Sequence, residues 1–93
     1  MLQNLLGEVK WQLLCDKYER DYINSINENI FICIYNLFEK YYFYYIDDII
    51  VNYLELFEKD YDYVEKKILE LKEELGNVFV FIIGNNVRYL EKI

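Results

Sequence analysis

The chain has 93 residues, a formal net charge of −7 and 55% hydrophobic residues, which is consistent with one compact domain, residues 1–93. This apolar content excludes wholesale disorder in spite of the charge. The sequence has no histidine and its only serine, Ser25, has no base beside it, so the usual acid–base and nucleophilic catalysts are missing. Its three glycines are too scattered for a phosphate-binding loop. We therefore expect neither an enzyme nor a cofactor or metal site.

The missing residue types also indicate the kind of genome that encodes the chain. Alanine, proline and threonine are absent, whereas isoleucine, asparagine and tyrosine are abundant. Codons for the absent residues need G or C, and codons for the abundant ones can be written almost wholly in A and T. We infer an AT-rich genome, such as that of a low-GC bacterium or of a phage or mobile element that lives in one.

Residues 2–22 are expected to form the first helix. Their apolar positions recur at spacings of four, three and four residues, which is typical of one helix face. These positions are Leu2, Leu6, Val9 and Leu13, and Trp11 and Leu14 widen the stripe. Asparagines then interrupt the pattern. Ser25, followed three residues later by Glu28, has the form of a capping box that starts a second helix.

Residues 26–45 admit two interpretations. Their apolar side chains fit the periodicity of a helix, but residues 30–35 and 41–46 are mostly the β-branched and aromatic types that strands favour. We favour a helix because the pattern is unbroken and because the segment has neither glycine nor proline. A hairpin is the alternative.

The strongest helical signal runs from residue 46 to residue 75, where apolar side chains recur at spacings of three and four. It predicts either one helix over residues 47–75 or two helices that meet at residues 58–62. In the second case Asp60 or Asp62 would cap the later helix. Gly76 is expected to end it.

Residues 78–91 are predicted to form a β-hairpin, because an unbroken apolar run is followed by turn residues and then by an alternating segment. The expected fold class is therefore α+β, predominantly helical, with three to four helices and a C-terminal β-hairpin. Nothing in the apolar run protects the edge of the strand from pairing with another chain. For this reason we also expect a homodimer.

Cys15 and Cys33 are expected to be reduced and buried in the core, because no export signal accompanies them. The first ten residues lack the basic and apolar regions of a signal peptide. The longest apolar runs have six residues, against about 20 for a membrane helix. We therefore expect a cytoplasmic location and no membrane contact.

Negative charge is concentrated in residues 41–65, which carry seven acidic side chains and one lysine. A field of this sign repels nucleic acid and attracts a basic protein surface. Four of the acids recur at spacings of three, four and three, so on one helix they would form a stripe with neighbours about 5–6 Å apart, similar to the repeat of phosphates. The predicted acidic contact residues are Asp47, Asp48, Glu55, Glu58, Asp62 and Glu65. An ordinary solvated helix face is the alternative.

Eight of the eleven tyrosines lie between residues 35 and 63. Residues 41–45 cannot all face inward on a helix or a strand, and exposed tyrosine is common in binding hot spots because it gives a large contact area at a small entropy cost. The predicted aromatic contact residues are Tyr41, Tyr44, Tyr45 and Tyr63. Codon bias that fills surface positions with tyrosine is the alternative.

Together these features predict a small acidic protein that binds and blocks a basic, nucleic-acid-handling protein, with nucleic-acid mimicry as one route. In size, charge and genome bias the chain is similar to anti-CRISPR proteins and to immunity proteins that neutralise nuclease toxins, although no residue-level motif carries the likeness. Direct binding of nucleic acid is not expected. The alternative is a structural or assembly protein that acts through homo-oligomerisation.

Overall fold

A computed structural model describes residues 2–93, and this part of the chain is helical without any strand. In chain order its elements are α1 (Leu2–Leu6), α2 (Glu8–Lys17), α3 (Arg20–Ser25), α4 (Glu28–Lys40), α5 (Ile46–Asn52), the 3₁₀ helix η1 (Leu54–Glu58), α6 (Tyr61–Leu75), α7 (Phe79–Asn85) and the 3₁₀ helix η2 (Val87–Lys92). The predicted α+β class is therefore wrong, and the fold is all-α.

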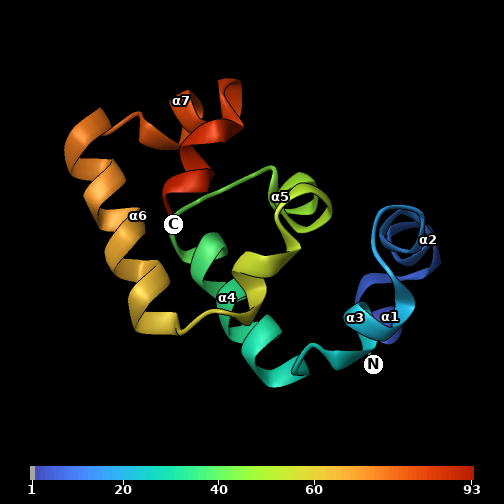
Figure 1. Ribbon diagram of the computed structural model, residues 1–93. Helices are drawn as coiled ribbons and strands as arrows, with labels where there is room; N and C mark the ends of the chain where they lie inside the picture. The colour runs from blue at the N-terminus through green and yellow to red at the C-terminus, as the bar shows by residue number, and fades with distance from the viewer. Residues whose placement is uncertain (1) are drawn as a thin grey trace.

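The helices are arranged around α4, as Figure 1 shows. Helices α1–α3 lie at one end of the molecule and α6 and α7 lie at the other, while α4 and α5 lie between them (Figure 1). Helix α4 contacts α5, η1 and α6. The principal extents are 37 × 25 × 19 Å. None of the helices within residues 2–93 is long and apolar enough to cross a membrane.

The centre of the core is a cluster of phenylalanine rings. Phe31 and Phe38 project from the same side of α4, and their ring centroids lie 4.9 and 5.6 Å from that of Phe57 in η1. Phe43 connects this cluster to α7, because its ring packs edge-on against Phe79 at 5.9 Å. Such aromatic pairs add to the free energy gained from burial alone. The aromatic side chains of the middle segment thus join α4 and η1 to α7 near the C-terminal end of the chain.

The predicted C-terminal hairpin is wrong, because residues 79–92 form two helices, α7 and η2. Phe79 and Ile83 are four residues apart on α7, and both are buried in the core. The hydroxyl of Tyr45 donates a hydrogen bond to the main-chain oxygen of Val80 at 2.6 Å. The side chain of Asn86 accepts from the N–H of Arg88 and caps η2. Packing thus overrides the β propensity of the apolar run. Of the predicted turn residues, Gly84 and Asn85 belong to α7, and Asn86 alone separates α7 from η2.

The predicted helix over residues 2–22 is divided into three helices. Gly7, with φ 82° and ψ 168°, separates α1 from α2. Extended residues at Tyr18 and Glu19 separate α2 from α3. The predicted apolar face is partly correct, because Leu2, Trp11 and Leu14 are buried, whereas Val9 is 77% exposed and Leu13 is also exposed.

The helical interpretation of residues 26–45 is correct for residues 28–40, which form α4. The predicted cap is wrong, because Asn27 and not Ser25 accepts the hydrogen bond from the N–H of Ile30. The hydroxyl of Ser25 instead donates to the main-chain oxygen of Tyr22. After Lys40 the chain leaves the helix, and α5 starts at Ile46.

The long helical signal of residues 46–75 becomes α5, η1 and α6. Of the two predicted caps, Asp60 is correct, because its carboxylate accepts from the N–H of Tyr63 at 3.3 Å. Gly76 follows the last residue of α6, as predicted. The break at Tyr53, which separates α5 from η1, has no glycine, proline or capping residue to announce it.

The expectation for the two cysteines is only partly correct. Both are free thiols, but Cys15 is half-buried against the core and Cys33 is exposed on α4. The prediction that both are buried is wrong, because Cys33 lies outside the buried face of α4, which is formed by Phe31, Ile34, Leu37 and Phe38.

Candidate functional site: an acidic surface with tyrosines

The six predicted acidic residues differ in what they contact. Asp47 pairs with Lys10 at 2.9 Å, and Glu58 accepts a hydrogen bond from the hydroxyl of Tyr22 at 2.6 Å. Glu65 is bound by two groups of the same protein. These three carboxylates therefore take part in holding the helices together.

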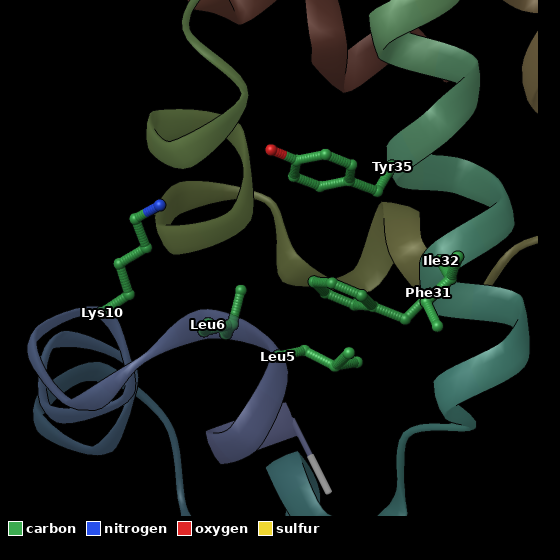
Figure 2. Close-up of a pocket in the computed structure, with 6 residues that line it drawn as sticks. All are labelled: Leu5, Leu6, Lys10, Phe31, Ile32 and Tyr35. Atoms are coloured by element: carbon green, nitrogen blue, oxygen red, sulfur yellow. The ribbon is translucent and has the colours of Figure 1, made fainter.

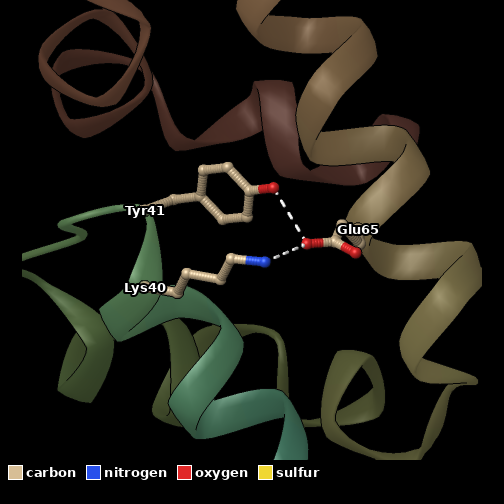
Figure 3. Close-up of polar contacts among 3 residues, drawn as sticks. All are labelled: Lys40, Tyr41 and Glu65. Atoms are coloured by element: carbon tan, nitrogen blue, oxygen red, sulfur yellow. Dashed lines mark hydrogen bonds and ion pairs between the residues drawn. The ribbon is translucent and has the colours of Figure 1, made fainter.

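Glu65 lies where the end of α4 meets α6. One of its carboxylate oxygens accepts from the ammonium of Lys40 and from the hydroxyl of Tyr41, each at 2.9 Å (Figure 3). The hydrogen bond from Lys40, followed by that from Tyr41, lowers the pKa of Glu65 below its ordinary value. The same pair raises the pKa of Lys40. Glu65 is thus a negative charge that the protein itself neutralises.

Glu58 receives a neutral donor instead of a cation. Burial of the ring, and then the hydrogen bond to Glu58, raise the pKa of Tyr22 far above its ordinary value, so that the phenol stays protonated. The carboxylate of Glu58 keeps its full charge because a protonated phenol brings no positive charge. Glu58 is therefore oriented by Tyr22 without being neutralised.

Asp48, Glu55 and Asp62 are exposed, and no side chain among residues 2–93 pairs with them. Each lies in the first turn of its element, in α5, η1 and α6 respectively. A negative charge in the first turn favours a helix, which explains in part why the sequence places acids there. These three carboxylates are nevertheless free to bind a cation from another molecule.

The predicted stripe of four acids on one helix is not present. Glu55 and Glu58 belong to η1, whereas Asp62 and Glu65 belong to α6, and the chain is extended between the two elements. The regular spacing that a single helix would impose is therefore lost at this junction. What remains is a negatively charged surface without the repeat of a nucleic-acid strand.

The four predicted tyrosines also divide into two groups. Tyr41 and Tyr45 are half-buried and donate hydrogen bonds within the protein. Tyr44 is 72% exposed, and Tyr63 is exposed with its ring beneath the ammonium groups of two lysines, Lys59 at 5.5 Å and Lys67 at 5.7 Å. Tyr44 and Tyr63 are thus the two with ring surface available to a partner.

Sequence reasoning missed a cleft between the first two helices and α4. It has a volume of about 240 Å³, and Figure 2 shows its lining residues, which are Leu5, Leu6, Lys10, Phe31, Ile32 and Tyr35. Its lining residues come from both sides of the turn at Gly7, Leu5 and Leu6 from α1 and Lys10 from α2, and from α4. Its one cation, Lys10, is already paired with Asp47. The cleft is smaller than most ligand sites.

Within residues 2–93, no three acidic or thiol side chains lie close enough together to hold a metal ion. In comparisons with known proteins, no family model, curated protein or solved structure matches the chain.

Proposed function

We propose that this protein binds and blocks a basic, nucleic-acid-handling protein through the acidic surface of residues 41–65. The observation that carries the proposal is the exposure of Asp48, Glu55 and Asp62, which have no partner in the described part of the chain. Only one lysine accompanies the seven acids of this segment. The free carboxylates supply both a long-range field and acceptors for direct contacts.

The physical basis of the proposal is electrostatic complementarity. A basic protein that handles nucleic acid presents lysines and arginines to phosphates, and unpaired carboxylates bind the same side chains. The field of an acidic surface also accelerates association with such a target. An exposed ring such as that of Tyr44 adds contact area beside the charges. Occupation of the basic surface then excludes nucleic acid from it.

The first prediction tests this surface by charge reversal. Asp48→Lys, Glu55→Lys and Asp62→Lys together should weaken binding to the target by several kcal/mol, because attraction is replaced by repulsion at three positions. The target is isolated on the immobilised wild-type protein and identified by its release as salt rises. The measurement is the affinity for that target, together with the concentration of this protein that inhibits its binding of nucleic acid.

The matched control is a triple reversal outside the segment: Glu39→Lys, Glu73→Lys and Glu91→Lys. These three carboxylates are also exposed and without a partner in residues 2–93, so the net charge changes equally. The control should retain most of the affinity. Equal loss in both variants, or no loss in either, would contradict a specific role of this surface.

A second candidate function is assembly with further copies of the chain. It is favoured by Val78 and Phe81, which are each 61% exposed near the start of α7. Residues 78–91 do not form the hairpin edge on which a homodimer was predicted, so a homodimer would now depend on exposed apolar side chains such as these. Salt distinguishes the two functions, because an electrostatic complex dissociates as salt rises and an apolar dimer does not. Sedimentation of the protein alone, at low and high salt, makes this comparison.

A further inference from the structure

We propose that the groove between α4 and the junction of η1 with α6 binds a large apolar side chain presented by a basic segment of the target protein. This inference rests on the proposed function and identifies the part of the target that is recognised. The groove has a volume of about 440 Å³. It is lined by Asn29, Ile30, Cys33 and Ile34 of α4, and by Glu58, Lys59, Asp60 and Tyr61 of the junction.

The floor and walls of the groove are apolar. Ile34 is fully buried and forms part of the floor, while Ile30 and Tyr61 are 41% and 37% exposed and stand beside it. Neither Ile30 nor Tyr61 packs into the hydrophobic core. An isoleucine, a tyrosine and a thiol that share one groove without covering one another leave apolar surface for another molecule to bury.

The rim of the groove carries uncompensated negative charge. Glu58 is oriented by the hydroxyl of Tyr22, and Asp60 by the N–H of Tyr63. Both donors are neutral, so both carboxylates keep their charge and have lone pairs left for a cation. The one cation in the lining, Lys59, is occupied elsewhere, because its ammonium donates to the main-chain oxygen of Ile93 and lies over the ring of Tyr63.

The combination of an apolar floor and an anionic rim determines the occupant. An apolar side chain fits the floor, and lysine or arginine neighbours on the same segment reach the two carboxylates. A purely apolar partner would leave Glu58 and Asp60 desolvated without a partner charge, which is unfavourable. A basic segment with an embedded leucine or phenylalanine therefore matches this groove better than an apolar face of a second copy does.

The experiment uses a short synthetic peptide with one leucine and one phenylalanine among lysines and arginines, labelled with a fluorophore. Binding to the full chain is followed by fluorescence anisotropy. Two control peptides replace either the apolar pair by serine or the basic residues by glutamate. In parallel, alkylation of Cys33 is followed by mass spectrometry, with Cys15 as the internal standard because it lies outside the groove. Bound peptide should slow alkylation at Cys33 alone.

Two pairs of variants separate the floor from the rim. Ile30→Ser with Tyr61→Ser removes apolar wall and should weaken binding about tenfold or more. Glu58→Gln with Asp60→Asn keeps both oxygen acceptors, and should weaken binding while reducing its dependence on salt. The matched controls are Val9→Ser with Leu13→Ser, an exposed apolar pair on α2, and Glu39→Gln with Glu73→Gln. Both control pairs should bind as the wild type does.

Protection of Cys33 together with weaker binding by both groove pairs supports the proposal. Failure of the peptide to bind overturns it. Peptide binding that the groove pairs leave unchanged but that the Asp48, Glu55 and Asp62 reversal abolishes also overturns the groove, while the proposed function stands. Self-association that is lost in the Ile30 and Tyr61 variant, without peptide binding, assigns the groove to a second copy instead. If neither the charge reversal nor the groove pairs change the affinity for the isolated target, both proposals are contradicted.

Discussion

Tyr42 ends α4 in a conformation that glycine usually supplies. Its φ is 65°, in the left-handed region, and its N–H donates to the main-chain oxygen of Glu39. The N–H of Phe43 donates to the main-chain oxygen of Phe38, and the two rings pack at 5.1 Å. These two hydrogen bonds and this apolar contact define a Schellman motif with tyrosine at the left-handed position. The ring itself is 85% exposed, so packing does not explain the choice of residue.

Tyr42→Gly should therefore raise the free energy of unfolding by about 0.5–1 kcal/mol, because the cost of a left-handed L-residue exceeds the added entropy of glycine in the unfolded chain. Urea titration measures the change. Tyr42→Ala is the control, since it removes the ring but keeps the left-handed backbone, and it should stay within about 0.5 kcal/mol of the wild type. A destabilised glycine variant would show that the exposed ring stabilises the fold in a way its exposure does not indicate.

At the scale of the helices, the sequence predicts best where periodicity is long and the ends carry recognisable caps. Helix α6 is of this kind, with Asp60 before it and Gly76 after it. Helix α4 is periodic throughout, although its cap, Asn27, was missed in favour of Ser25. The short elements α7 and η2 were predicted wrongly as a hairpin, because a few residues of helix gain their stability from the core they pack against and not from a long periodic pattern.

The sequence predicts which residues make up the candidate site, but not which of its acidic side chains have partners within the protein. The acidic residues themselves are evident in the sequence. Which of them are free depends on contacts between distant segments, such as Tyr22 with Glu58 and Lys40 with Glu65, which are 36 and 25 residues apart. The groove could not be predicted from the sequence either, because its two walls come from α4 and from the junction before α6, which are distant in the chain.

Gly7 provides a test at this scale. Its φ of 82° and ψ of 168° lie in a region that only glycine readily adopts. A Cβ at this position would meet no atom within 4 Å, so the cost of Gly7→Ala is that of the backbone alone. We expect a loss of about 1–3 kcal/mol in the free energy of unfolding, measured by urea titration. D-alanine at the same position, introduced by chemical synthesis, accepts this conformation and should restore the stability. Equal losses with both enantiomers would contradict the backbone explanation.

At the scale of the whole molecule, the hydrogen bonds and ion pairs between side chains lie at the surface, around a core that is entirely apolar in the described residues 2–93. No polar or charged residue among residues 2–93 is buried. The side-chain pairs that join different helices include Lys10 with Asp47, Lys17 with Asn52, Tyr22 with Glu58, Lys40 with Glu65, and Lys92 with Glu74. Three of these pairs use acids of residues 41–65. Half of the predicted acidic contact residues thus serve the fold, and the proposed function depends on the other half.

The contact of Glu65 with Lys40 and Tyr41 makes the docking of α6 on α4 dependent on pH. Because the pKa of Glu65 is lower in the folded protein, its contribution to stability is fully present above the pKa of an unfolded glutamate, about 4.3. That contribution is lost as the pH falls through the folded pKa, where the carboxylate takes up a proton.

Glu65→Gln removes this titration while keeping an oxygen that accepts hydrogen bonds. Its stability should consequently fall less steeply than that of the wild type between about pH 5 and pH 3, as measured by urea unfolding at a series of pH values. Glu73→Gln, on the same helix and without a partner in the described chain, should leave the slope unchanged. Identical slopes for wild type and Glu65→Gln would mean that Lys40 and Tyr41 do not hold this carboxylate in solution.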